Sequence, residues 1–186
     1  MGNSSEMGMH SLEQARAAIL ARLEPMAAES VLLAQSAGRV LAADVAAAVN
    51  LPRFDNSAMD GYAVIAAEAG TGAQLQCVGE VPAGSAFGGT LQSGQCLRIF
   101  TGSPMPTGAN AVVMQEDTRV EAHRVEITEG VKPFEHIRLR GEDVKEGEPS
   151  GRAGEVMHAG RLQLLGAAGV ARVEVHRRPI VGVLAT

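Results

Sequence analysis

The sequence contains no tryptophan, one tyrosine and only 3% aromatic residues among its 186 positions. Stacking of bases on aromatic side chains is therefore not a binding mode that this chain can use widely. The basic face of a nucleic-acid groove is also missing, because 16 Lys and Arg stand against 21 Asp and Glu, a formal net charge of -5. These two deficits predict that the chain binds no nucleic acid.

Long apolar runs and cysteine motifs are missing as well. No run approaches the ~20 apolar residues of a transmembrane helix, so we expect no membrane span. Cys77 and Cys96 form no CxxC pattern, which argues against a structural zinc site. No charged-then-apolar signal peptide opens the chain, and residues 1–10 resemble a polar tail or cloning remnant. We therefore expect a cytoplasmic protein with reduced thiols.

A helix is predicted at residues 11–24. Ser11 and Gln14 have the spacing of a capping box, in which hydroxyl and amide satisfy the free N–H groups at a helix start. Pro25 ends the pattern. The apolar residues between them share one helical face: Leu12, Ala15, Ile19 and Leu23.

Between residues 50 and 135 the pattern changes to short Val, Ile and Leu runs separated by Gly, Pro, Asn and Asp. This texture is typical of a small β-rich domain. Residues 162–169 then predict a short helix and residues 170–175 a strand. Helical texture on both sides of the β-rich segment predicts an α+β fold, in which a barrel-like or sandwich-like β-rich domain is inserted into a discontinuous α/β linker domain.

The expected boundaries follow from these changes in texture. We assign residues 1–10 to the tail, 11–49 to the N-terminal helix and the first part of the linker domain, 50–140 to the inserted domain, 141–178 to the second part of the linker domain, and 179–186 to the first strand of a further domain. The last assignment rests on the Ile-Val-Gly-Val-Leu run after Pro179, which is typical of a buried strand.

Three loops contain side chains that can carry chemistry. In the first, residues 54–62, four polar residues lie within six positions: Asp55, Asn56, Ser57 and Asp60. Such clusters commonly form local Asx and Ser turns. The functional alternative is a loop whose oxygens bind Mg²⁺, or bind the sugar or phosphate of an anionic ligand.

The second loop, residues 98–109, follows a predicted strand that delivers Thr101. Gly102 and two prolines then favour a rigid turn. This pattern is either a plain connection between strands or a site where the Thr101 hydroxyl and nearby N–H groups bind an oxyanion. Gly102 would permit close approach of the ligand.

The third loop, residues 137–143, carries Arg138 and Arg140 at alternate positions of a predicted strand, followed by Glu142 and Asp143 at a turn. Alternate positions project from one face of a strand, and arginine suits bidentate binding of phosphate or another oxyanion. The alternative is a solvated edge strand of mixed charge.

Taken together, the three loops resemble the motifs of one family. Residues 51–64, LPRFDNSAMDGYAV, closely resemble the signature of molybdopterin molybdenumtransferases, the MoeA and gephyrin E-domain family. Residues 98–102 with 108–116 resemble the second motif, and residues 140–144 the third. Residues 178–186 resemble a family stretch that continues with Gly-Asp-Glu-Leu. The resemblance implies the N-terminal and linker region of such an enzyme.

The resemblance implies a function in molybdenum cofactor biosynthesis. Enzymes of this family insert molybdate into adenylylated molybdopterin with release of AMP, and Mg²⁺ or another divalent ion assists. A molybdopterin adenylyltransferase-type enzyme would act upstream. The alternative is a non-catalytic scaffold or dimerisation module of the same fold, because fold alone does not settle function.

The resemblance also implies roles for individual residues. Asp60, Thr101 and Asp143 match active-site positions. The two aspartates would hold Mg²⁺-bound water or molybdate, and Thr101 would hydrogen-bond an oxyanion. The positions expected to contact substrate are Asn56, Ser57, Gly102, Arg138 and Arg140.

The family's α/β domain that binds the pterin, and its small C-terminal β domain, have no counterpart in these 186 residues. In the family's homodimer the active site forms between that α/β domain of one subunit and the present loops of the other. The resemblance therefore predicts that this chain alone is inactive.

Overall fold

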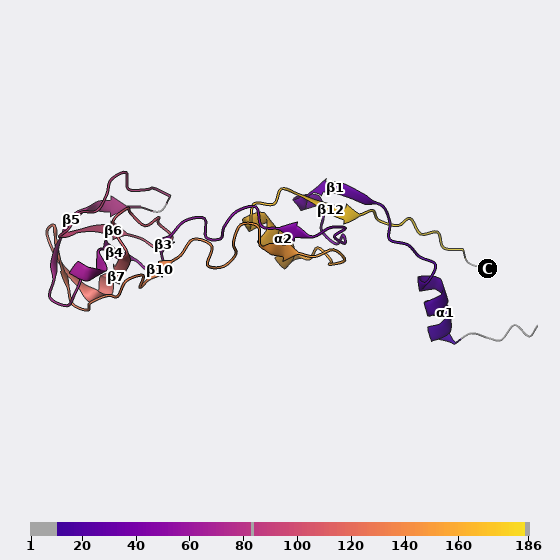
Figure 1. The fold of residues 1–186 in the computed structure, drawn as a ribbon, viewed down its shortest axis with the longest axis horizontal. Coiled ribbons are helices and arrows are strands. Elements are labelled where there is room, and N and C mark those ends of the chain that lie inside the picture. The colour runs from indigo at the N-terminus through magenta and orange to yellow at the C-terminus, as the bar shows by residue number, and fades with distance from the viewer. Residues whose placement is uncertain (1–10, 83, 185–186) are drawn as a thin grey trace, which may run out of the picture.

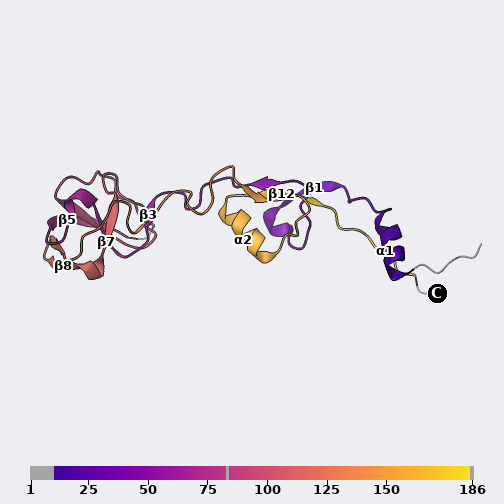
Figure 2. The same ribbon diagram turned by 60° about the horizontal axis from the view of Figure 1, so that its bottom comes forward.

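The computed structural model describes residues 11–82 and 84–184, which form an elongated molecule. Figures 1 and 2 show a β-rich domain at one end, a small domain around α2 in the middle, and α1 with the C-terminal segment at the other end. Two stretches of chain connect the β-rich domain to the middle one, and they pair where Leu51 bridges Val144.

The middle domain is assembled from both ends of the sequence. Strand β1 (Ala28–Leu32) pairs with β12 (Arg172–His176), and β2 (Val45–Ala46) pairs with β11 (Pro149–Gly151). Helix α2 (Ala159–Ala167) supplies Leu165 to the shared core. These long-range pairings confirm the discontinuous linker domain with a β-rich insertion, while the exact domain boundaries stay a prediction.

The β-rich domain is built on a curled, six-stranded sheet. In spatial order its strands are β7 (Ala111–Met114), β4 (Gly61–Val64), β6 (Gln95–Ile99), β5 (Gln74–Val81), β9 (Arg124–Ile127) and β8 (Thr118–Glu121). Only β5 and β6 run parallel, and the other neighbours are antiparallel. A further ladder joins β3 (Asn56–Ser57) to β10 (Ile137–Arg138). Short 3-10 turns lie at Leu33–Gln35, Ala66–Glu68 and Gln115–Asp117.

The central strands of this sheet are buried on both faces. Tyr62 and Val64 of β4 enter one apolar cluster, whereas Ala63 enters the cluster on the opposite face. All four residues of β4 are buried, and Cys96 and Leu97 of β6 divide between the two clusters in the same way. Alternation of side chains along a strand thus explains why successive residues of β4 and β6 can both be apolar.

Helix α1 (Leu12–Leu20) begins at the predicted residue but ends four residues early. Ser11 accepts a hydrogen bond from the Gln14 N–H and donates its own N–H to the Gln14 amide oxygen, so the capping box is present. The prediction of helix to residue 24 was wrong because the residue before a proline disfavours helical geometry, which here stops the helix before Pro25. No residue of α1 is buried.

The C-terminal apolar run is unpaired within the described residues, and its assignment to the first strand of a further domain stays a prediction. Residues 179–184 form no strand pairing, and Ile180, Val181, Val183 and Leu184 are exposed. A strand requires a neighbour for its backbone groups, and no described segment lies beside this run. Both described α-helices have nine residues, and neither is long and apolar enough to cross a bilayer.

Candidate functional site

Strand β3 brings the three sequence-predicted loops together. On one side, the Gly102 N–H donates to the Ser57 carbonyl at 2.8 Å, and the Ser57 N–H donates to the Ser103 carbonyl at 3.0 Å. On the other side, β3 pairs with β10, with Arg138 opposite Asn56. Loops that are distant in sequence therefore meet at one end of the β-rich domain.

Asn56 and Ser57 use their side chains to shape this junction. Both are buried, and the Asn56 amide donates to the Phe54 carbonyl at 3.1 Å. The Ser57 hydroxyl donates to the Met59 carbonyl at 2.5 Å and accepts from the Met59 N–H at 3.3 Å. These are the local turn bonds typical of Asn and Ser, and direct contact of either residue with a substrate stays a prediction.

Asp60 and Thr101 form the best-defined polar pair among the predicted site residues. Asp60 precedes β4 and Thr101 follows β6. The antiparallel register of Gly61 with Ile99 places both residues at the same end of this strand pair. The Thr101 N–H and the Thr101 hydroxyl each donate to Asp60 Oδ1 at 2.8 Å. Both residues are exposed, so the free oxygen of Asp60 faces solvent.

The two hydrogen bonds have an electrostatic consequence. The Thr101 N–H, then the Thr101 hydroxyl and, more weakly, Arg98 hold the pKa of Asp60 below its ordinary value. Asp60 is therefore a carboxylate at neutral pH. Because the Thr101 hydroxyl proton is already donated to Asp60, this hydroxyl is left as an acceptor rather than as the free donor to an oxyanion that the resemblance implied.

Arg98 supports this pair, although no role was predicted for it. Its guanidinium carbon lies 5.1 Å from the ring centre of Tyr62 and 5.0 Å from that of Phe100. It also donates to the Gly61 carbonyl at 3.4 Å and to the side chain of Gln115. The alternation of Arg98 with Phe100 along one strand was the only sequence signal, and the neighbouring Tyr62 and Gln115 come from other strands and turns.

Arg138 and Arg140 do not act together as predicted. Strand β10 ends at Arg138, so the expected single face of alternating arginines does not form. Arg138 instead binds two carboxylates, Glu142 at 2.6 Å and Asp143 at 2.5 Å. The same ion pair, followed by the Leu139 N–H, lowers the pKa of Glu142. The mixed-charge alternative therefore describes the surroundings of Arg138 better than an open oxyanion site does.

The described residues do not supply a complete set of ligands for a magnesium ion. They contain no group of three or more His, Cys, Asp or Glu side chains able to hold a metal. Asp60 has one oxygen committed to Thr101, and Asp143 is paired with Arg138. Mg²⁺ is commonly held by one or two carboxylates together with water and substrate phosphates, so Asp60 can supply one ligand at most.

The backbone conformation at position 102 explains why a glycine follows Thr101. Its φ angle is +83°, a region that other residues rarely adopt, and an added Cβ would meet no atom within 4 Å. The backbone geometry alone therefore requires glycine here. The open space is compatible with the predicted close approach of a ligand.

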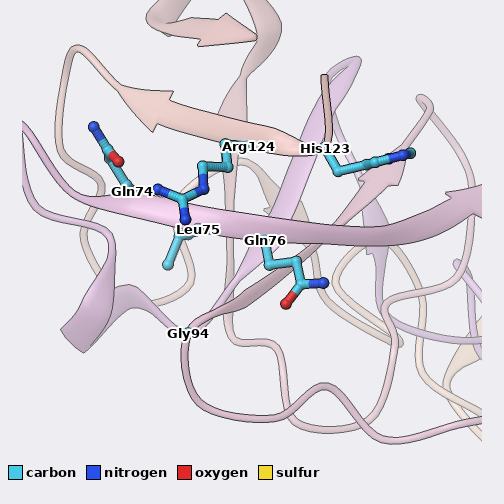
Figure 3. Close-up of a pocket in the computed structure, with 6 residues that line it drawn as sticks. All are labelled: Gln74, Leu75, Gln76, Gly94, His123 and Arg124. Carbon is cyan, nitrogen blue, oxygen red and sulfur yellow. The ribbon is translucent and has the colours of Figure 1, made fainter. Parts of the chain in front are cut away.

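A separate pocket lies away from these loops, on β5, the start of β6 and the β8–β9 turn. Figure 3 shows its lining residues, Gln74, Leu75, Gln76, Gly94, His123 and Arg124, with the His123 ring pointing away from the Gln74 and Arg124 side chains. None of the predicted site residues lines it. The candidate site therefore remains the loop cluster around β3.

Comparison with known proteins identifies the family. The chain matches the MoeA N-terminal region (domain I and II) over residues 10–169. It belongs to the MoeA family of molybdopterin molybdenumtransferases. It is 38% identical over 180 residues to a molybdopterin molybdenumtransferase of Haemophilus influenzae, which covers 96% of this chain and 45% of that protein. With its counterpart from a Nostoc species it shares 42% identity over 154 residues, 80% of this chain and 35% of the relative.

Solved structures agree with this MoeA-family assignment. A molybdopterin biosynthesis MoeA protein from Pyrococcus horikoshii superposes with a TM-score of 0.78 at 35% identity, over 82% of this chain and 42% of that one. A second structure of a MoeA protein from the same organism gives a TM-score of 0.81 at 28% identity, over 90% and 44% of the two chains. The chain thus spans less than half the length of these MoeA relatives and corresponds to their N-terminal region.

Proposed function

We propose that this chain is the N-terminal part of an enzyme that inserts molybdate into adenylylated molybdopterin and releases AMP in molybdenum cofactor biosynthesis. The family membership supports the pathway, and the Asp60–Thr101 pair is the observation that carries a catalytic role. We extend the proposal to the family's cytoplasmic location, its homodimer with a shared site, its use of Mg²⁺ and an upstream adenylyltransferase-type enzyme. The proposal also assigns a catalytic role to Asp143, the third residue that matches an active-site position of the family.

The charge of Asp60 limits what it can do in this reaction. Molybdate and the phosphoanhydride of the substrate are anions, so an ionised carboxylate repels both when it faces them directly. Asp60 therefore acts through a water molecule that lies between it and the anion. Thr101 fixes the carboxylate so that its free oxygen points outward, which positions that intervening group.

The proposed inactivity of the chain alone follows from exposure. Asp60 and Thr101 are both exposed on loops of the β-rich domain. Electrostatic interactions strengthen when a second surface excludes water from such a site. We propose that a pterin-binding domain of a partner subunit supplies that surface.

The test is molybdate-dependent AMP release by a chain of the relatives' length that carries these loops. Asp60→Asn and Thr101→Ala should each lower the rate by about 100-fold, the lower end of what a positioned side chain contributes to a rate. Arg119→Gln, on the distant strand β8, is the matched control and should leave the rate unchanged. Near-normal rates in both site variants would refute the site assignment, whereas no AMP release by the unmodified longer chain would favour the non-catalytic scaffold. Turnover by residues 1–186 alone would refute the proposed inactivity.

A further inference from the structure

A second pocket, with a volume of about 470 Å³, lies where the β-rich domain meets the connection to the linker domain. Its walls are residues 53–55, residues 104–109 and Arg140. The pocket thus draws on all three loops but contains neither Asp60 nor Thr101. Arg53 was not among the predicted site residues, and Arg140 was placed there only with Arg138.

Backbone hydrogen bonds tie the turn that carries Arg140 to the segment that carries Arg53. The Arg140 N–H donates to Asp55 Oδ1 at 2.7 Å, and the Gly141 N–H donates to the Pro52 carbonyl at 3.0 Å. The turn that carries Arg140 is therefore pinned to residues on both sides of Arg53. Gly141 permits this turn because its φ angle is +73°.

The charges of the pocket favour an anion. Neither Arg53 nor Arg140 forms an ion pair within the described part of the chain, in contrast to Arg138. Asp55 is the acidic residue of the lining, and one of its oxygens already accepts the Arg140 N–H. Two guanidinium groups against one engaged carboxylate leave a net positive charge in a concave surface, which suits a phosphate group.

The remaining lining is mostly apolar, apart from Thr107, and includes an aromatic ring. Phe54, between Arg53 and Asp55, keeps 47% of its surface exposed. Pro104, Met105 and Pro106 also line the pocket, and the Met105 N–H donates to the Asp55 carbonyl at 2.9 Å. An exposed aromatic ring in a chain with only 3% aromatic residues is available to pack against a planar ring of a ligand.

We propose that this pocket binds a phosphate ester that also carries a planar ring, with Arg53 and Arg140 on the phosphate and Phe54 against the ring. The proposal deepens the proposed function, and it rests on that function only for the identity of the natural ligand. The residues named here all belong to this chain, so their binding can be measured on it directly.

Isothermal titration calorimetry of the 186-residue chain at low ionic strength tests the proposal with AMP and with ribose 5-phosphate, which lacks the ring. We expect both to bind and AMP to bind more tightly. Arg53→Gln and Arg140→Gln should each raise the dissociation constant for both probes by about tenfold, as expected for a lost charge-assisted hydrogen bond. Phe54→Ala should remove the advantage of AMP over ribose 5-phosphate and leave the affinity for ribose 5-phosphate unchanged.

Arg119→Gln is the matched control, because it removes one positive charge from an exposed position on β8 outside the pocket. Its affinity for AMP should stay within about twofold of the parent chain, since distant exposed charges are screened. The proposal is overturned if the parent chain binds no AMP at millimolar concentration, if Arg119→Gln loses as much affinity as the pocket variants, or if the pocket variants bind normally. Thermal unfolding of each variant verifies its fold. Failure here leaves AMP release by the longer enzyme as a separate test of the proposed function.

Discussion

Thr101 donates two hydrogen bonds to a single oxygen of Asp60, one from its backbone N–H and one from its hydroxyl, both at 2.8 Å. The two residues are separated by 41 positions in sequence, and the β4–β6 ladder brings them together. One oxygen of the carboxylate is thereby fixed and the other is free. This relationship determines both the charge and the direction of the candidate catalytic group.

Thr101→Val removes the hydroxyl donor and keeps the backbone N–H. Because the N–H is the larger cause of the lowered pKa, we expect the pKa of Asp60 to rise only part of the way to its ordinary value of 3.8. Thr101→Ser keeps both donors and should leave the pKa low. NMR titration of the Asp60 side-chain carboxyl carbon measures the difference, and equal values in the Val and Ser variants would contradict it.

The same shift sets the sign of a pH effect on folding. Asp60 has a lower pKa in the folded chain than in the unfolded one, so its contribution to stability is present above the ordinary pKa and is lost as the pH falls through the lowered value. In Thr101→Val the folded-state pKa lies closer to the unfolded one, so the contribution should be smaller and its loss should be complete at a higher pH. Unfolding curves measured across this acidic range detect the change.

Gly61→Ala should destabilise the β-rich domain strongly. A Cβ at this position would lie 2.0 Å from the Val113 carbonyl oxygen on β7, so the central strand β4 has to move. We expect a loss of about 3 kcal/mol in the free energy of unfolding, at the upper end of ordinary overpacking effects. Urea denaturation provides the measurement.

Gly70→Ala is the natural control for that experiment. An added Cβ there meets no atom within 4 Å, and Gly70 has no positive φ angle. Its stability should stay within about 0.5 kcal/mol of the parent chain. A similar loss in both variants would show that the β7 contact is not the cause.

Much of the fold could be predicted from local sequence patterns. The capping box at Ser11 and the short apolar runs of the β-rich domain each correspond to an observed element. The insertion was predictable because helical texture lies on both sides of the β-rich segment. The end of α1 was predicted too late, because the helical face continued through Leu23 while the approach to Pro25 disfavours helical geometry.

The candidate site was predictable in composition but not in connectivity. Sequence motifs singled out Asp60, Thr101 and Arg138, and the structure places all three in loops that meet at β3. Which polar group faces which depends on pairing between distant strands, which local periodicity does not contain. For that reason the ion pairs of Arg138 and the contacts of Arg98 were not foreseen.

Arg138→Gln should raise the pKa of Glu142. Arg138 is the main cause of the lowered value, and the Leu139 N–H, which remains in the variant, is the second. The pKa should therefore rise while staying below the ordinary value. Carbon-detected NMR titration of the Glu142 carboxyl group follows this change, with Arg119→Gln as the charge-matched control. An unchanged pKa would show that the ion pair does not persist in solution.

Cys96 should be inert to alkylation in the folded chain, whereas Cys77 should react. Burial, together with the neighbouring Cys77, raises the pKa of the Cys96 thiol to about 12, and its side chain is fully buried. Alkylation requires the thiolate, so both charge state and access protect Cys96. Cys77 lies opposite Cys96 in the β5–β6 ladder but is only partly buried.

Iodoacetamide at pH 8 should therefore add one label, located at Cys77 by peptide mass spectrometry, and Cys77→Ser should accept none until urea unfolds the chain. Rapid labelling of Cys96 without denaturant would mean that the core around β6 opens readily.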